Sequence, residues 1–485
     1  MGEIAFESAV QLAAAIRTKR IGSRELLEHY VQRVERLNPK INAVVTLDLD
    51  RARRRADAAD AALARGEVWG PLHGVPMTIK DSFETAGLRT TAGANELAQH
   101  VPATDATAVS RLVAAGAVVF GKTNLPIYAM DVQSYNPVFG TTNNPWDVTR
   151  SPGGSSGGSA AALAAGLTGF ELGSDIGGSI RNPAHYCGVY GHKPSFGLVP
   201  CRGHIPGPPG TLSEADINVA GPLGRSADDL ALGMNVLAGP DAAQAVAWRL
   251  ELPRPRATAL RDFRVAVWAD DPACPVDDTV QARVRATADA LRRAGVAVDE
   301  TARPALRFAD AYRLYLQLLR AATSAGVPRE VYQTLLGVSP QLPDDADDVT
   351  ARFARFVTQR YREWLPANER RQKLRAVWAE FFRNFDVLVC PITPTAAIGH
   401  DHSQPYMNRT ISVNGQTRPY LDQIAWAGLI GMVYLPVTMA PVGRTPGGLP
   451  VGVQAVGPYL EDRTTIEFAR CLAEVIGGFE APPGF

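Results

Sequence analysis

The chain has 485 residues, of which 46% are hydrophobic and 20% are charged, values typical of a soluble globular protein with a large core. Basic and acidic residues are balanced at 49 each, so no net charge attracts nucleic acid or an anionic membrane. These values favour a small, uncharged ligand, and we expect neither a nucleic-acid partner nor a membrane partner.

Cysteine usage and the first residues bear on the compartment. The five cysteines are widely separated, odd in number and form no CxxC pair, which argues against a disulfide framework and a zinc site. They are Cys187, Cys201, Cys274, Cys390 and Cys471. Residues 1–20 contain two glutamates and no basic lead, which predicts an amphipathic helix rather than a signal peptide. No run of about 18 apolar residues occurs, so we predict no membrane span and a cytoplasmic location.

The first part of the chain alternates helical and strand-like patterns. Apolar residues recur at helical spacing from Ser23, which predicts a helix that Ser23 caps and that ends before Pro39. Residues 41–47 (INAVVTL) are typical of a strand, and residues 50–66 predict a helix that ends at a glycine. Residues 75–81 (VPMTIKD) form a short apolar segment that ends in charged residues.

The same alternation continues along the chain. Residues 105–116 predict a helix, residues 117–122 a strand, and the alanine-rich run after Ser159 a buried helix. Residues 263–300 repeat strand, helix and strand, and residues 303–385 are mostly helical. Because no linker divides the chain, we predict a single large α/β domain with a central mixed sheet covered by helices on both faces.

Two short patterns match known motifs without the context that those motifs need. Gly116 to Thr123 (GAVVFGKT) fits the phosphate-loop pattern, but a helix precedes it and its middle residues are typical of a strand. Gly153 to Gly157 (GGSSG) fits the nucleophile elbow of α/β-hydrolases, but a loop-like stretch precedes it, and no histidine lies in a sequence context that marks it as the catalytic partner. We favour neither interpretation.

A serine- and glycine-rich segment, residues 151–193, is more informative. Its glycines cluster at two points, each beside serine, where backbone can approach a ligand closely. In DIGGS, the amides of Ile176, Gly177, Gly178 and Ser179 are placed to form an oxyanion hole beside the serine. A tight structural turn is the alternative.

The proton acceptor for such a serine is suggested by the rarity of lysine. Only six of the 49 basic residues are lysine, and Lys80 ends the apolar segment 75–80. Burial lowers the pKa of a lysine, and the neutral amine is then a competent base, as in Ser–Lys variants of the catalytic triad. The alternative is an ion pair with Asp81.

Together these segments resemble the amidase signature family. The similar stretches include GVPMTIKDSFETAG, GKTNLPIYAM, SPGGSSGGSAAALAAG, GSDIGGSIRNPAHYCGVYGHKPS, VAGPLGRSADDLAL and GLPVGVQAVG, and they agree with the family in order and spacing. The resemblance implies one amidase signature domain over 1–485, with a signature core at about 60–235 and a variable helical substrate funnel at about 303–385. It also implies a reaction that needs no metal and no organic cofactor.

The resemblance assigns a Ser–Ser–Lys triad to Lys80, Ser155 and Ser179. Ser179 is the implied nucleophile, Ser155 passes its proton to Lys80, and the peptide bond between Gly154 and Ser155 is implied to be cis. The reaction is then acyl transfer through an acyl-enzyme that water hydrolyses.

Further residues receive supporting roles. Asp175 and Arg181 flank the nucleophile and are expected to fix its backbone, and Ser156 is expected to support Ser155 and Lys80. Ala129 and Met130 follow GKTNLPIY, where the resemblance places the wall of the acyl pocket, with simple core packing as the alternative.

The triad does not define the substrate. We expect hydrolysis of carbon–nitrogen bonds in hydrophobic or aryl amides by a monomer or homodimer. Alternatives are a carbamate hydrolase, a glutaminase like the A subunit of glutamyl-tRNA amidotransferase, and a non-catalytic binding protein. Specificity is expected from Asp131 and residues 201–218, 303–364 and 400–425; Ile176 stands where the amidotransferase subunit usually has threonine. An apolar stripe in the helical stretch is a candidate funnel cap: Phe308, Tyr312, Tyr315, Leu316 and Leu319.

Overall fold

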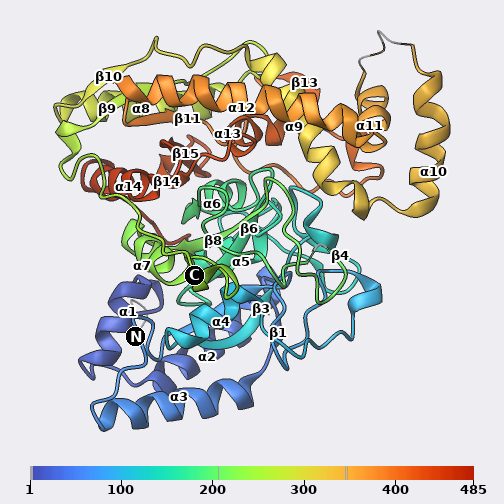
Figure 1. Cartoon of the computed structure of the whole chain (residues 1–485). Coiled ribbons are helices and arrows are strands. Elements are labelled where there is room, and N and C mark those ends of the chain that lie inside the picture. Colours follow the sequence, from blue (N-terminus) through green and yellow to red (C-terminus); the bar gives the residue numbers. More distant parts are fainter. Residues whose placement is uncertain (1–3, 206, 344–345, 347) are drawn as a thin grey trace.

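A computed structural model describes residues 4–205, 207–343, 346 and 348–485 (Figure 1). Its centre is a sheet of eleven described strands that mixes parallel and antiparallel pairs. In spatial order the strands are β1 (Val44–Leu47), β3 (Val118–Thr123), β2 (Pro76–Lys80), β6 (Glu171–Asp175), β8 (Val219–Gly224), β7 (Tyr190–Lys193), β14 (Val437–Arg444), β15 (Pro450–Val456), β11 (Val387–Cys390), β9 (Arg264–Val267) and β10 (Ala297–Asp299). Two small hairpins lie outside it: β4 (Tyr135–Asn136) with β5 (Gly140–Thr141), and β12 (Thr410–Val413) with β13 (Gln416–Pro419).

Helices surround this sheet. They are α1 (Ala9–Arg17), α2 (Ser23–Ile41), α3 (Leu49–Ala64), α4 (Thr107–Ala114), α5 (Gly157–Ala164), α6 (Arg181–Cys187), α7 (Ala227–Leu237), α8 (Asp278–Arg293), α9 (Phe308–Thr323), α10 (Arg329–Val338), α11 (Val349–Val357), α12 (Tyr361–Asn384), α13 (Ala425–Gly431) and α14 (Asp462–Ile476). Short 3-10 helices are η1 (Ile4–Phe6), η2 (Asn95–Leu97), η3 (Ile127–Ala129), η4 (Gln244–Val246), η5 (Leu260–Asp262), η6 (Ser324–Gly326), η7 (Ser339–Gln341), η8 (Tyr406–Asn408) and η9 (Tyr420–Ile424).

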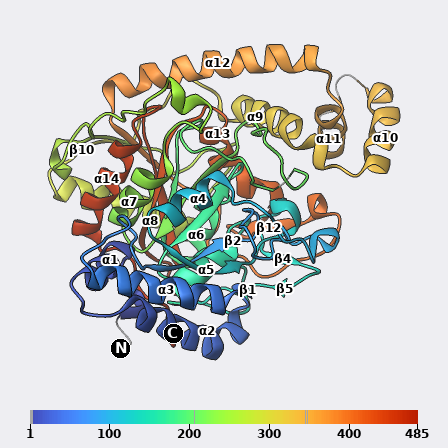
Figure 2. The ribbon, with the colours of Figure 1, turned by 60° about the horizontal axis from the view of Figure 1, so that its bottom comes forward.

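The helices form two packed groups against the strands. Helices α5 and α6 contact each other and the strands β6, β7 and β15, whereas α7, α14 and α8 form a second group that contacts β8 and β14. In both views α12 spans one end of the molecule, and α10 and α11 project to the side (Figures 1 and 2). The predicted single α/β domain with helices around a mixed sheet is confirmed. Among the described helices, none is both long and apolar enough to cross a bilayer.

The predicted boundaries of α2 are wrong at both ends. Gly22 is the N-cap, and Ser23 is the first helical residue, whose hydroxyl donates to a distant carbonyl, that of Gly74. The helix continues through Pro39 to Ile41, where Asn38 closes the last turn. The Asn38 carbonyl accepts the Asn42 amide, and the Asn38 side-chain oxygen accepts the amides of Ala43 and Val44. The strand after it therefore begins later than predicted.

The phosphate-loop pattern is part of the sheet. Its last six residues form β3, which pairs with β1 and β2 and is buried throughout. Lys122 donates to Phe83 O, Thr85 Oγ1 and Thr90 Oγ1, so its ammonium is bound to the protein. This geometry excludes the open loop of backbone amides that a phosphate site needs.

Candidate active site

Lys80 is the last residue of β2 and is fully buried. Its Nζ donates to Ser155 Oγ at 2.6 Å and to Ser174 Oγ at 2.9 Å. Burial lowers the pKa of Lys80 to about 7, and the negative charge of Asp175 opposes that shift. A neutral amine is therefore available near physiological pH.

The alternative ion pair between Lys80 and Asp81 does not form. Asp81 instead accepts from the amide and hydroxyl of Thr91 at 3.0 and 2.6 Å. Burial raises the pKa of Asp81 to about 6, opposed by the positive charge of Lys122. Within the described part of the chain, no carboxylate forms an ion pair with Lys80.

Ser155 precedes α5 in a crowded turn. The peptide bond between Gly154 and Ser155 is cis, as the resemblance implies. A Cβ on Gly154 would lie 2.7 Å from Asp131 O and from Gln133 N, so only glycine fits this position. The amide of Gly154 donates to Asn182 Oδ1 at 3.2 Å, which links this turn to α6.

Ser179 lies in the loop between β6 and α6, and Asp175 shapes that loop. The carboxylate accepts the amides of Gly178 and Ile180 at 2.9 and 3.0 Å, and it binds Arg181 through two hydrogen bonds. Burial alone would raise the pKa of Asp175, but the charge of Arg181 lowers it to about 2. The carboxylate is thus ionised and holds the loop from within.

Arg181 extends this support to the other half of the sheet. It is fully buried, and its Nη1 donates to Ala427 O at 2.9 Å and to Gln454 Oε1 at 2.7 Å. The loop of residues 176–180, which carries Ser179 and is called the nucleophile loop after its predicted role, is therefore connected to α13 and β15, more than 240 residues away in sequence. The loop-fixing role expected of Asp175 and Arg181 agrees with these contacts.

The four amides expected to form an oxyanion hole differ in their availability. The amide of Gly178, a residue with φ +107°, donates a hydrogen bond to Asp175 and is therefore not free to bind a substrate oxygen. The amides of Ile176, Gly177 and Ser179 have no hydrogen-bond acceptor among the described residues, and these three residues line a cavity. The candidate oxyanion hole is thereby reduced to three donors.

Ser156 makes contacts other than those expected. Its amide donates to Ser179 O at 3.1 Å, and its hydroxyl donates to Ser174 O at 3.4 Å, so it supports the nucleophile loop directly. Ser174, the second hydroxyl at Lys80, was missed by sequence reasoning. The available signal was its position at the end of a strand, one residue before Asp175.

A cavity of about 620 Å³ opens beside Ser179. The Ser179 hydroxyl makes no hydrogen bond to a described residue, and the residue as a whole is 7% exposed. Ala129 and Met130 line the cavity, as expected for pocket-wall residues. Each specificity segment named from the sequence contributes to the lining as well: Asp131, His204, Pro208, Asn218, Tyr315, Leu319, Arg320, Tyr406, Tyr420, Leu421 and Ile424.

The apolar stripe of α9 divides between core and cavity. Tyr315 and Leu319 line the cavity, and the Tyr315 hydroxyl donates to Ile176 O at 3.3 Å. Phe308 instead packs edge-to-face against two tryptophans in the core, and the Tyr312 hydroxyl donates to a carbonyl of η9. Of the five residues predicted to cap a funnel, two therefore line the cavity.

One wall of the cavity has an unusual backbone. Tyr128 and Ala129 have φ values of +49° and +59°, a left-handed conformation that residues with a Cβ seldom adopt in succession. Such conformations concentrate at functional sites, where surrounding contacts hold them. Here the Tyr128 amide donates to Ala92 O, and its hydroxyl donates to Glu96 Oε1 at 2.6 Å.

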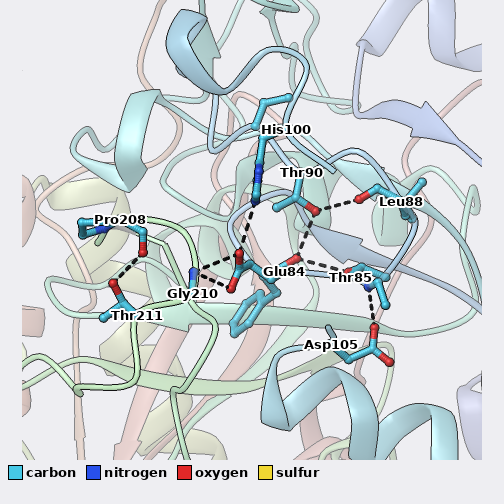
Figure 3. Close-up of polar contacts among 12 residues, drawn as sticks. Glu84, Thr85, Leu88, Thr90, His100, Asp105, Pro208, Gly210 and Thr211 are labelled. Carbon is cyan, nitrogen blue, oxygen red and sulfur yellow. Dashed lines mark hydrogen bonds and ion pairs between the residues drawn. The ribbon is translucent and has the colours of Figure 1, made fainter. Parts of the chain in front are cut away.

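Glu84 holds residues 207–211, some of which line the cavity (Figure 3). Both of its carboxylate oxygens accept the Gly210 amide at 3.2 Å, and one also lies 3.2 Å from His100 Nε2. Thr211 Oγ1 donates to Pro208 O at 2.5 Å within the same loop. These contacts position Pro208 at the cavity.

Histidine does not supply the base at this site. His204 lines the cavity, but burial and the charge of Lys80 lower its pKa to about 3, and its Nε2 lies 3.1 Å from Ser82 Oγ. In the described part of the chain, no histidine makes a hydrogen bond to Ser155 or Ser179. Nor does any group of three or more His, Cys, Asp or Glu residues there have a metal-binding arrangement.

Comparison with known proteins identifies the family. The Amidase family model matches residues 25–466. The A subunit of the glutamyl-tRNA(Gln) amidotransferase of Anaeromyxobacter sp. (strain K) is 34% identical over 98% of this chain and 97% of its own length.

Solved structures agree with that assignment. An inhibitor-bound structure from work on a vestigial protein complex and the origins of an s-triazine catabolic enzyme has a TM-score of 0.81. It is 28% identical and covers 98% of this chain and 100% of its own. A bacterial aryl acylamidase, with a TM-score of 0.82 and 24% identity over 99% of each chain, shares the fold. The chain therefore belongs to the amidase signature family and is an enzyme that acts on carbon–nitrogen bonds.

Proposed function

We propose that the chain hydrolyses hydrophobic or aryl amides through an acyl-enzyme on Ser179. Ser155 and Lys80 form the proton path: Ser155 and Ser179 both line the cavity, and Lys80 Nζ donates to the Ser155 hydroxyl. The observation that carries this proposal is the buried Lys80 amine, with a pKa of about 7, bound 2.6 Å from the Ser155 hydroxyl.

The proposed chemistry begins when the Ser179 hydroxyl meets Ser155 in the substrate complex, the stage at which catalytic hydrogen bonds commonly tighten. Ser155 accepts the Ser179 proton and passes its own to neutral Lys80, while Ser179 Oγ bonds to the amide carbonyl carbon. The carbon–nitrogen bond then breaks, and the proton returns through Ser155 to the leaving amine. Water follows the same path to release the acid and restore Ser179.

The developing negative charge on the carbonyl oxygen needs fixed donors. The amides of Ile176, Gly177 and Ser179 are the proposed oxyanion hole, because all three lie at the cavity and lack another described acceptor. Removal of one such donor in other enzymes costs about 10²–10³ in rate. The bond between Asp175 and the Gly178 amide fixes the loop that presents them.

The cavity lining supports an apolar substrate. Tyrosine rings and aliphatic side chains form most of the wall, among them Ala129, Leu319 and Ile424, together with Met130. Such a lining binds an aryl or alkyl group, with few polar groups to orient it. A carbamate presents the same carbonyl to the same residues, so it is tested as a competing substrate.

A second candidate is favoured by the curated relatives, which are amidotransferase subunits. This function would require partner subunits and ammonia release from glutamine. Ile176, where that subunit usually has threonine, and the distinct loop 201–218 at the cavity favour an independent hydrolase. We propose that the enzyme acts as a monomer or homodimer. The five buried, free cysteines favour a cytoplasmic enzyme.

The test is amine release from a matched aryl amide and aryl carbamate by the purified chain alone. We expect hydrolysis that Ser179→Ala abolishes, and the ratio of the two rates distinguishes an amidase from a carbamate hydrolase. If neither substrate is hydrolysed and glutaminase activity appears once amidotransferase partner subunits are added, the second candidate replaces the proposal.

A further inference from the structure

Arg320 lies in the last turn of α9 and lines the same cavity as Ser179. It follows Tyr315, which contacts the nucleophile loop, by five residues, and this spacing places it about 7.5 Å farther along the helix axis. The residue is only 8% exposed. Its guanidinium is therefore a largely buried cation in the cavity that Ser179 also lines.

The contacts of Arg320 leave its charge unbalanced. Its Nη1 donates to the Tyr406 hydroxyl at 3.1 Å, and its guanidinium carbon lies 4.8 Å from the centre of the Phe353 ring. Among the described residues, no carboxylate forms an ion pair with it. A buried arginine is ordinarily paired, because removing its charge from water is costly.

The other ionisable groups at the cavity do not offset this charge. Asp131 is paired with Arg409 at 2.7 Å, and Glu96 is an exposed lining residue whose carboxylate accepts the Tyr128 hydroxyl. The low pKa of His204, about 3, keeps that imidazole neutral. The described lining thus presents one guanidinium without a carboxylate partner in a mostly apolar cavity.

We propose that Arg320 and Tyr406 bind a carboxylate carried by the substrate, so that the enzyme prefers anionic amides with a hydrophobic body. This inference rests on the proposed function and names its substrate class. A guanidinium binds a carboxylate through two parallel hydrogen bonds. Tyr406 accepts a hydrogen bond from Arg320, so its own hydroxyl hydrogen is available to the same anion.

Two substrate pairs test the preference and the position of the charge. Glutaric acid mono-4-nitroanilide and its methyl ester place the carboxylate on the acyl part, and N-butyryl-4-aminobenzoate and its methyl ester place it on the amine part. In at least one pair, we expect kcat/KM to favour the acid by roughly tenfold or more. Arg320→Met removes that preference, Arg320→Lys retains part of it, and Arg293→Met, on an exposed arginine of α8, leaves it unchanged.

Binding of the same four compounds to Ser179→Ala, measured by calorimetry, separates this inference from the hydrolytic function. Tighter binding of an acid than of its ester, lost in Ser179→Ala combined with Arg320→Met, supports the anion site even if the wild type hydrolyses none of the four. Equal rates and equal affinities for acid and ester in both pairs overturn the anion site and leave the hydrolase intact. Melting temperatures verify folding, and Arg320→Lys decides the outcome if Arg320→Met is unstable.

Discussion

We expect Lys80 to make the activity dependent on pH. Its pKa, lowered from 10.5 to about 7 by burial, leaves the amine increasingly neutral as the pH rises through 7. Because only the neutral amine accepts a proton, we expect kcat/KM to fall about tenfold per pH unit below that pKa and to level off above it. A pH–rate profile on an amide without ionisable groups measures this.

Substitutions at the same residue provide the controls. Lys80→Met removes the base and is expected to lower kcat by about 10³-fold or more, and Lys80→Arg fails too because a guanidinium stays protonated. A profile that stays flat across neutral pH, or full activity in Lys80→Met, would contradict the assignment.

Arg181 is expected to matter for stability as well as for rate. Arg181→Ala leaves the buried Asp175 without its cation, and breaking such a pair costs about 3–5 kcal/mol of the free energy of unfolding. Urea denaturation measures the loss, with Arg383→Ala, which breaks an exposed pair with Glu380, as a control near zero. Full stability and full activity in Arg181→Ala would show that the pair does not support the loop.

At the scale of single residues, the sequence predicted the features that depend on neighbouring residues along the chain. The rarity of lysine and the apolar run before Lys80 indicated a buried base but left an ion pair with Asp81 as the alternative, and the structure has the buried amine with a lowered pKa. Two contacts were not predicted: Lys80 donates to the Ser174 hydroxyl, and the Gly178 amide donates to Asp175 and so leaves the candidate oxyanion hole. Both depend on the directions of side chains at the ends of neighbouring strands. No pattern in one sequence specifies those directions.

At the scale of elements, the packing of α13 on α9 sets the position of Tyr315. A Cβ on Gly428 would lie 2.2 Å from the Tyr315 ring, so Gly428→Ala must displace that ring from the nucleophile loop. We expect a loss of about 1–3 kcal/mol in the free energy of unfolding and a raised KM.

Thermal unfolding and steady-state kinetics measure both effects. Gly337→Ala is the matched control, because its Cβ meets nothing within 4 Å in α10 and alanine favours helix by about 1 kcal/mol. Similar behaviour of the two variants would contradict a positioning role for Gly428.

The apolar periodicity of the sequence predicted which segments form helices and strands, but it did not always predict where they begin and end. The course of α2 past Pro39 depends on the contacts of Asn38 with the following turn, which local propensity does not reveal. Likewise the apolar face of α9 was evident, yet its division between core and cavity is decided by α13 and η9.

At the scale of the whole molecule, the sheet brings distant segments to one place. Lys80 ends β2, which lies beside β6, and Asp175 ends β6; Arg181 then links this part to β15 in the other half. The α/β class and mixed sheet were predictable from alternating patterns. The strand order was not, because it is fixed by long-range packing that one sequence does not display.

The cavity is assembled in the same way, from segments that lie far apart along the chain between Glu96 and Ile424. Their convergence explains how one catalytic arrangement can serve different substrates by changes in loops and helices around a fixed sheet.

The most direct test of the central claim is mass spectrometry of the purified enzyme quenched during turnover of an aryl amide. We expect a mass increase equal to the acyl group, mapped by peptide analysis to Ser179 and absent from Ser179→Ala. Hydrolysis by a wild type that carries no acyl group under these conditions, or an acyl group on Ser155 instead, would contradict Ser179 as the nucleophile.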